Sequence, residues 1–191
     1  MAGDPGQVTV TSVTILETER LLMRRLAWGD LDALHALYRD EEIRRYFPEG
    51  VLTLDETREE LDWFRNGHPE HPQLGLWATI HKPTGAFIGR CGLLPWTIDG
   101  VDEVEIAYLI AKLFWRRGLG AEAAQALVRY GFGTLGLPRL IALIDPRHEA
   151  SIRTAMRAGL RFEREVEVEG VRSALYAIVA SDQGRRSLSR S

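Results

Sequence analysis

The sequence predicts a mixed α/β fold in which helices cover both sides of a single sheet. The first observation is length, because 191 residues suit one domain that can bury roughly 70% of its unfolded surface without disulfides or a metal. The second is composition, since 45% apolar and 27% charged residues are typical of a globular protein. The third is element order: strand, two helices, three strands, helix, strand, helix and two strands.

The two ends of the chain are predicted to be flexible tails. Residues 1–13 are small and polar, and residues 181–191 are polar and basic without hydrophobic periodicity. The segment between them contains no repeat and no linker-like stretch. The sequence therefore predicts one domain at residues 14–180, flanked by tails at 1–13 and 181–191.

Charge and cysteine content exclude several classes of protein. A net charge of −3 argues against a dedicated nucleic-acid binder. Cys91 is the only cysteine, so a disulfide framework and an all-cysteine metal site are excluded. No apolar run has the length of a membrane span, and the first residues lack a signal-peptide pattern. We expect a soluble cytoplasmic protein with no nucleic-acid or membrane partner.

The N-terminal half is predicted to contain one strand and two helices. The strand is expected at Thr18–Leu26, and a helix then opens at Trp28 with apolar residues three or four positions apart. A second helix begins at Thr53, because Thr53 and Glu56 have the spacing of a capping box, and it ends near Gly67. The residues of this helix expected to face inward are Leu54, Leu61 and Phe64.

Three strands follow in the middle of the chain. Leu74–His81 and Ala86–Leu94 are expected to form a hairpin through the turn Lys82–Gly85. In this turn proline presets φ and glycine takes the left-handed position. Val101–Ile110 reads as a further strand.

The C-terminal part alternates helices with strands. Gly118–Phe132 has one apolar face and is predicted to be a helix. Leu140–Ile144 is continuously apolar, as expected of a strand buried on both faces. Glu149–Ala158 is a short helix closed by a glycine, and Phe162–Val168 with Val171–Val179 forms a final hairpin.

The segment Tyr108–Glu122 carries the clearest chemical signal. A strand runs into a short loop with Arg116 and Arg117, and Gly118 and Gly120 precede a helix. A helix N-terminus exposes unpaired N–H groups, and glycine lets a ligand approach the backbone closely. Arginine adds fork-shaped donors beside them. The segment therefore predicts a phosphate cradle.

Two nucleotide motifs are alternatives for this cradle. A Walker loop requires a lysine that the segment lacks. A dinucleotide fingerprint fits the spacing of Gly118, Gly120 and Ala123, with Asp145 at the end of the next strand. However, Ala111–Arg117 separates the strand from the glycines, and only 46 of the 191 residues follow Asp145. That is too few to complete a doubly wound sheet, so a dinucleotide-dependent oxidoreductase stays the weaker alternative.

The chain resembles the GNAT family of N-acetyltransferases, and within it the ribosomal-protein N-terminal acetyltransferases (RimJ/RimL-like). The likeness spans about residues 16–180. The blocks that carry it are Glu17–Leu21, Val104–Tyr108, Trp115–Gly120, His148–Ser151 and Gly159–Phe162. Two positions depart from the family pattern: Trp115 replaces arginine or glutamine in the acyl-CoA loop, and His148 replaces an asparagine.

The resemblance implies an acyl-CoA N-acyltransferase fold, with a mostly antiparallel sheet of about seven strands and a central parallel pair that splays apart. It implies acetyl-CoA as cosubstrate in the gap between Val101–Ile110 and Leu140–Ile144, with its pyrophosphate on the amides of Arg116–Ala121. The implied contact residues are Leu109, Ile110, Trp115, Arg116, Arg117, Gly118, Leu119, Gly120, Ala121, His148 and Ser151.

Two residues are candidates for catalysis. Glu105 lies in a largely apolar strand, where partial burial would raise the pKa of its carboxyl toward that of a useful base. The alternative is an exposed or ion-paired glutamate at a strand end. Ser151 is the candidate hydrogen-bond donor to the leaving thiolate, and its alternative role is to satisfy backbone groups at a helix start. His148 contacts the cofactor if it replaces the family asparagine.

No metal is expected, because the histidines lack a metal-ligand spacing. Cys91 lies mid-strand between glycines and is expected to be a buried, inert thiol. The resemblance thus predicts an acetyl-CoA-dependent N-acetyltransferase that acts on a small-molecule or peptide amine. It also implies that two copies of the protein pair as a homodimer. Acidic residues near the cleft, Asp102, Glu103 and Glu105, favour a cationic acceptor. The alternative within the same fold is a non-catalytic acyl-CoA sensor.

Overall fold

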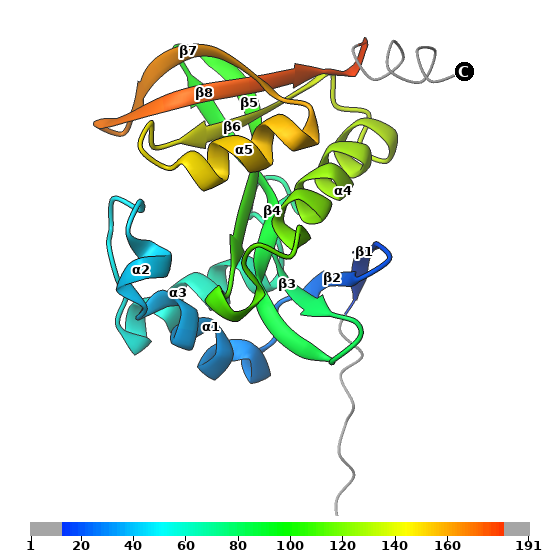
Figure 1. The fold of residues 1–191 in the computed structure, drawn as a ribbon, viewed down its shortest axis with the longest axis vertical. Coiled ribbons are helices and arrows are strands. Elements are labelled where there is room, and N and C mark those ends of the chain that lie inside the picture. Colours follow the sequence, from blue (N-terminus) through cyan, green and yellow to red (C-terminus); the bar gives the residue numbers. More distant parts are fainter. Residues whose placement is uncertain (1–12, 182–191) are drawn as a thin grey trace, which may run out of the picture.

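One sheet organises the molecule, and helices lie on both of its faces (Figure 1). The computed structural model describes residues 13–181. In these residues eight strands are ordered β1-β2-β3-β4-β5-β6-β8-β7 across the sheet. Their bounds are β1 Thr14–Glu17, β2 Leu21–Arg25, β3 Gly75–His81, β4 Ala86–Ile98, β5 Val101–Ile110, β6 Arg139–Ile144, β7 Arg161–Val168 and β8 Val171–Val179.

The sheet divides at its one parallel pair among the described strands, β5 and β6. All other neighbours run antiparallel, whereas β5 and β6 share a single paired position, Glu105 opposite Ile141. Beyond it the two strands part toward their C-terminal ends. In Figure 1, β6, β8 and β7 therefore form one end of the molecule, and β1, β2 and β3 lie toward the other. The mixed sheet with a splayed parallel pair is confirmed.

The helices form two groups on opposite faces. Their bounds are α1 Leu31–Tyr38, α2 Glu41–Arg44, α3 Leu54–Arg65, α4 Leu119–Gly133 and α5 Glu149–Ala158. Two short 3₁₀ turns lie at Trp28–Asp30 and Lys112–Phe114. Buried residues of α1 and α3 cluster with Leu109 of β5. Those of α4 and α5 cluster with Ile106 and Ile110, which point to the other face of the same strand.

The strongest local signals of the sequence are confirmed. Thr53 and Glu56 form the expected capping box at the start of α3: the Glu56 carboxylate accepts from the Thr53 N–H (2.7 Å), and Thr53 Oγ1 accepts from the Glu56 N–H (3.3 Å). Hydrogen bonds from Thr53 lower the pKa of Glu56. Leu61 and Phe64 are buried as predicted. Leu54 was predicted to face inward, but its side chain is 40% exposed because it lies in the solvated first turn.

Three elements differ from the sequence prediction. The strand predicted over Thr18–Leu26 is shorter, β2 at Leu21–Arg25, because the Thr18 hydroxyl accepts from the Leu21 N–H and makes a turn there; β1 at Thr14–Glu17 precedes this turn and was not predicted. Helix α2 was not predicted, since four residues are too short to show periodicity. Strand β4 was predicted to end at Leu94 but continues past Pro95. A proline is tolerated there because β3 pairs only as far as Leu93, so β4 has a free edge.

The predicted tails cannot be compared with the structure, because residues 1–12 and 182–191 lie outside the described part of the chain. Within residues 13–181 no helix is long and apolar enough to cross a membrane.

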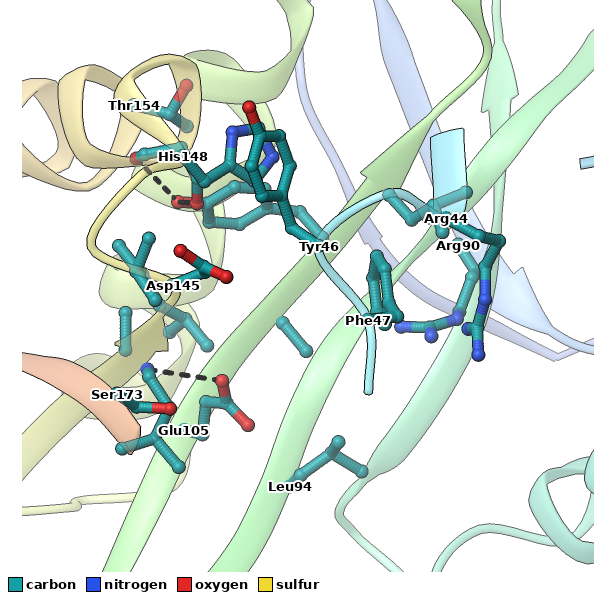
Figure 2. Close-up of a pocket in the computed structure, with 18 of the residues that line it drawn as sticks. Arg44, Tyr46, Phe47, Arg90, Leu94, Glu105, Asp145, His148, Thr154 and Ser173 are labelled. Atoms are coloured by element: carbon teal, nitrogen blue, oxygen red, sulfur yellow. Dashed lines mark hydrogen bonds between the residues drawn. The ribbon is translucent and has the colours of Figure 1, made fainter. Parts of the chain in front are cut away.

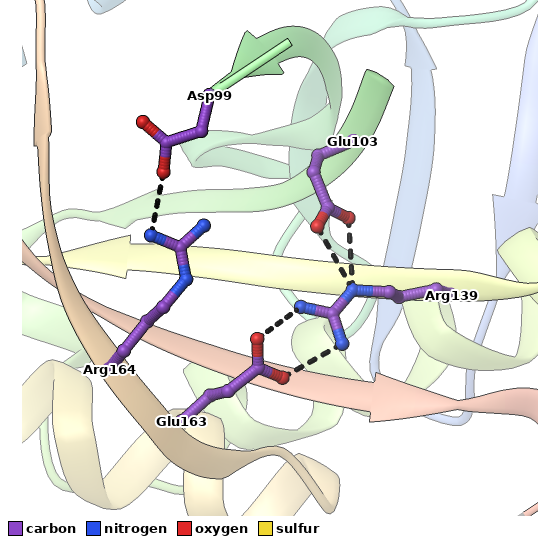
Figure 3. Close-up of polar contacts among 5 residues, drawn as sticks. All are labelled: Asp99, Glu103, Arg139, Glu163 and Arg164. Carbon is purple, nitrogen blue, oxygen red and sulfur yellow. Dashed lines mark hydrogen bonds and ion pairs between the residues drawn. The ribbon is translucent and has the colours of Figure 1, made fainter. Parts of the chain in front are cut away.

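An arginine clamp closes the narrow end of the β5–β6 wedge (Figure 3). Arg139 of β6 donates from Nε to both carboxylate oxygens of Glu103 on β5 (3.0 and 3.1 Å). Its two Nη atoms donate to Glu163 of β7 (2.8 and 3.0 Å). Glu103 is buried, so these bonds compensate a desolvated charge. The clamp ties three strands together two residues before the point where β5 and β6 diverge.

Replacing Arg139 by methionine should lower the free energy of unfolding by about 2 kcal/mol, because Glu103 would be left buried and unpaired. Chemical denaturation measures this. The control is Arg164→Met, which removes an exposed arginine that pairs with Asp99 nearby (2.8 Å) and should cost less than about 1 kcal/mol. Equal losses for the two variants would contradict the clamp.

Candidate active site

A large cleft opens where β5 and β6 separate. Its volume is about 1980 Å³, and its lining comes from β4, β5 and β6, the segment after α2, and the starts of α4 and α5. Glu105 lies at the vertex of the wedge (Figure 2). Its Oε1 accepts from the Leu143 N–H (3.2 Å), so a side chain takes the place of a ladder bond at the divergence. Ligands commonly bind at the carboxyl ends of such parallel strands.

The environment of Glu105 makes its carboxyl a weak acid. Desolvation by burial raises the pKa to about 7, although the hydrogen bonds from Trp96 and Leu143 and the charge of Arg90 act in the opposite direction. The Trp96 indole donates to Oε2 (2.8 Å). Both oxygens are thus oriented, and each can still accept a further hydrogen bond. Glu105 is partly buried and lines the cleft, and its role as a catalytic base stays a prediction.

The glycine loop, residues 115–120, follows the C-terminal end of β5 and forms a cradle of backbone donors. Gly118 is left-handed (φ 78°) directly before α4, and Arg116 is also left-handed (φ 60°), which is unusual for a residue other than glycine. Alternation of this kind turns successive N–H groups toward one side and creates an anion-binding concavity. Gly120 lies in the first turn of α4 and lines the cleft with Leu119 and Ala121. The loop fits a phosphate group.

The family comparison settles what this arrangement is. The family model for the acetyltransferase (GNAT) domain matches residues 20–161. The chain belongs to the GNAT family. It is 32% identical over 164 residues to the uncharacterized protein YkkB of Bacillus subtilis, covering 85% of this chain and 94% of that protein. It is 29% identical over 150 residues to the uncharacterized N-acetyltransferase YoaA of the same organism, with 78% and 84% coverage.

Solved structures agree with this assignment. The GNAT acetyltransferase from Bacillus anthracis superposes with a TM-score of 0.75 at 26% identity, covering 86% of this chain and 97% of that one. The acyl-CoA N-acyltransferase fold is therefore confirmed, and the chain is an acetyl-CoA-dependent acetyltransferase, as membership in the GNAT family entails. The single parallel pair differs from the parallel sheet that the dinucleotide alternative requires.

The residues predicted to contact the GNAT cosubstrate come together in the structure, with one exception. The cleft is lined by Leu109, Ile110, Trp115, Arg116, Gly118, Leu119, Gly120, Ala121, His148 and Ser151. Arg117 does not line it, because its guanidinium packs over the ring of Phe114 (5.2 Å to the centroid). Trp115 also has a structural contact, since its indole donates to the Ile110 carbonyl (2.6 Å) and closes the loop.

Ser151 lies in the first turn of α5 and is paired with a tyrosine. The Tyr108 hydroxyl lies 3.0 Å from Ser151 Oγ and donates to the Ser151 carbonyl (3.1 Å). Desolvation raises the pKa of Tyr108, so its hydroxyl stays protonated and able to donate. His148 caps the same helix and stacks on Tyr46 (4.2 Å between ring centroids). Burial lowers the pKa of His148 and favours its neutral form.

An anchor that the sequence analysis missed holds the glycine loop in place. Glu122, in the first turn of α4, accepts from the Arg20 N–H (3.0 Å) and Nε (2.7 Å) and from the Thr18 hydroxyl. Arg20 Nη1 in turn donates to the Arg117 carbonyl (3.0 Å). Partial burial opposes ionisation of Glu122, but the bonds from Thr18 and Arg20 outweigh it and lower the pKa. The sequence signal for this anchor was the run Thr18-Glu19-Arg20 directly before β2, which supplies two of the three anchoring side chains.

The other candidates lie as follows. Cys91 is buried on β4, and desolvation raises the pKa of its thiol to about 11, which fits an inert thiol. Among residues 13–181 no cluster of metal-ligating side chains occurs. Two further cleft residues, Arg44 and Arg90, were not predicted, because α2 was not predicted and Arg90 reads as an ordinary strand residue.

Replacing Glu122 by glutamine should raise the KM for acetyl-CoA about 5- to 30-fold with little change in kcat, because the loop loses its charged anchor. Steady-state kinetics with acetyl-CoA varied at saturating amine tests this. Asp62→Asn is the matched control, since it removes an exposed pair with Arg65 on α3, outside the cleft. A fall in kcat at unchanged KM would contradict an anchoring role.

Proposed function

We propose that this chain is an N-acetyltransferase that moves the acetyl group of acetyl-CoA to a primary amine by direct attack in a ternary complex. The observation that carries the proposal is the open wedge with Glu105 at its vertex and the glycine loop at its rim. The cleft exceeds the usual volume of a pocket for one small ligand, roughly 300–1,000 Å³, and so suits two reactants.

Acetyl-CoA binding is proposed to use backbone groups. The amides of Arg116–Ala121 take the pyrophosphate at the start of α4, with Arg116 supplying charge. The pantetheine arm runs along β5 at Leu109 and Ile110. This part of β5 has no paired strand on its β6 side among the described residues, so its backbone can pair with an extended ligand. Trp115 and His148 complete the proposed contacts, whereas Arg117 is left out because its side chain packs on Phe114 outside the cleft.

Glu105 is proposed to act as the general base. An ammonium cannot attack, so the acceptor first transfers a proton to the Glu105 carboxylate. The free amine nitrogen then forms a bond to the thioester carbonyl carbon, and the carbon–sulfur bond breaks. A pKa of about 7 leaves a large deprotonated fraction at neutral pH while keeping the carboxylate basic enough to accept a proton.

Ser151 is proposed to stabilise the leaving thiolate by donating its hydroxyl proton into a hydrogen bond. The Tyr108 hydroxyl lies 3.0 Å from Ser151 Oγ, and it donates to that oxygen when the serine proton is given to the thiolate. The attacking nitrogen becomes positively charged as its bond to carbon forms, and the proton that it then loses goes to the departing thiolate. The products are the amide and the free thiol of coenzyme A, and the first proton stays on Glu105 until it is released to solvent.

The departures from the family pattern do not favour the non-catalytic sensor. Trp115 bonds to the Ile110 carbonyl and His148 stacks on Tyr46, and both contacts leave the cleft open. We further propose that the protein belongs to the RimJ/RimL-like subgroup and works in the cytoplasm. A protein N-terminus or a small-molecule amine is the proposed acceptor, and a homodimer with one domain per chain at residues 14–180 is the proposed assembly.

Glu105→Gln should lower kcat/KM for the amine about 10²- to 10⁴-fold, because glutamine can keep a hydrogen bond but cannot accept the proton. In the wild type the base is active when deprotonated, so kcat/KM should fall as pH drops below an apparent pKa of about 7. The inflection near 7 should vanish in Glu105→Gln, whose residual rate should rise with pH up to the pKa of the acceptor amine itself. Initial rates between pH 5.5 and 9, with the acetyl-CoA affinity from calorimetry, test both points.

Asp102→Asn is the matched control for this experiment, since Asp102 is exposed on the same strand and outside the cleft. It should leave the rate and the pH profile unchanged. A Glu105→Gln enzyme that keeps the inflection near 7, or that works at the wild-type rate, would remove Glu105 from proton transfer.

A further inference from the structure

Two buried arginines lie in the cleft, apart from the groups proposed to act in transfer. Arg44 ends α2 and is 3% exposed, and Arg90 lies on β4 and is 6% exposed. Both line the cleft. Figure 2 shows them grouped with Phe47, on the side of the cleft away from His148 and Thr154. Buried arginines are uncommon unless their charge is compensated.

Each guanidinium is held in a fixed orientation. Arg44 Nε donates to the Gly50 carbonyl (2.6 Å), and Arg90 Nε donates to the Tyr38 hydroxyl (2.6 Å). The ring of Phe47 lies within cation–π distance of both arginines. Its centroid is 4.3 Å from Arg44 Cζ and 5.7 Å from Arg90 Cζ. The two cations are thus pre-oriented around one aromatic ring.

The protein leaves several of their donors unfilled. Among residues 13–181, no group accepts a hydrogen bond from Arg44 Nη1 or from either Nη atom of Arg90. The nearby carboxylates compensate only in part. Glu49 meets Arg44 at 3.2 Å but is largely exposed, and Glu60 bonds to Tyr38 and lies 3.7 Å from Arg90 Nε.

The two like charges also oppose each other. Burial, and secondarily the charge of Arg90, lowers the pKa of Arg44, whereas burial of Arg90 is outweighed by Tyr38 and Glu60, which raise the pKa of Arg90. Both groups nevertheless stay protonated, because guanidinium does not lose its proton in proteins. A third, anionic partner in the cleft would therefore fill the open donors and relieve the repulsion.

Arg90 lies on the same face of the sheet as Glu105. In the pairing of β4 with β5, Arg90 lies opposite Leu109 and Leu94 lies opposite Glu105. Positions 90 and 94 share one face of the strand and are roughly 13 Å apart along it. A molecule with its amine at Glu105 can thus extend along this face toward the arginines.

Two of the three acidic residues behind the sequence argument for a cationic acceptor do not line the cleft. Glu103 is bound to Arg139 in the clamp, and Asp102 is exposed outside the cleft. Only Glu105 of that acidic group lines the cleft.

We propose that Arg44 and Arg90 form an anion subsite, and that the acceptor is a primary amine carrying a carboxylate or phosphate group. This inference rests on the proposed acetyl transfer, since it assigns the acceptor of that reaction. Arginine forks bind both anionic groups through paired N–H donors.

The test compares amines that differ only in their far group. The probes are ω-amino carboxylates of increasing chain length, the matching ω-amino phosphates, the neutral ω-amino amides and the diamines. The wild type should acetylate an anionic probe with a kcat/KM roughly tenfold to a hundredfold above that of its neutral amide. The phosphate and carboxylate arms show which anion the subsite takes.

Substitutions of the two arginines test whether they cause the preference for anionic probes. In Arg44→Gln and Arg90→Gln the ratio of kcat/KM for the anionic probe over its amide should fall toward one. Arg44→Lys and Arg90→Lys keep the charge, guard against misfolding and should retain part of the preference. Arg58→Gln, which removes an exposed arginine of α3 outside the cleft, should keep the full ratio. Calorimetry with acetyl-CoA verifies that each variant is folded.

The possible failures are distinguishable. Equal rates for anionic and neutral probes, or faster rates for diamines, would overturn the anion subsite while leaving acetyl transfer in place. A preference that survives in the glutamine variants would also overturn it. Acetyl-CoA binding without transfer to any probe would overturn the proposed function, and the subsite with it.

Discussion

The hydrogen bond between the Glu105 carboxylate and the Leu143 N–H is the contact on which the site depends. It lies where β5 and β6 stop pairing, so it satisfies a backbone donor that the diverging strand would otherwise leave unpaired. A carboxylate buried there is costly, and that cost appears as a pKa raised to about 7. The group that completes the broken ladder is thus the same group whose basicity suits proton transfer from an amine.

Two distant contacts hold this wedge in shape. At the closed end, Arg139 joins Glu103 and Glu163 and binds β5, β6 and β7 together. At the open end, Arg20 and Glu122 tie the first strands of the chain to the start of α4. Both use charge-assisted hydrogen bonds between segments far apart in the sequence. The two contacts therefore fix the strands at the closed end of the cleft and the start of α4 at its open end.

The sequence predicted the parts of the site that depend on local signals. The glycine loop was recognised because Gly118 and Gly120 precede a clear helix, and Glu105 was recognised from its place in an apolar strand. The Arg44–Arg90 pair was missed because it joins a four-residue helix to a strand more than forty positions away. The turn at Thr18 was missed because the partner that fixes it, Glu122, lies on α4. Such contacts depend on tertiary packing, which periodicity does not report.

Direct titration of the Glu105 carboxyl tests the central claim most closely. Carbon-13 NMR of protein labelled at the glutamate carboxyl carbons would follow each group against pH, and the signal missing from Glu105→Gln would assign Glu105. The structure predicts an apparent pKa of about 7 in the free enzyme. Titration near 4.5, the ordinary value for glutamate, would mean that the vertex of the wedge is solvated, and it would contradict a buried Glu105 acting as the base.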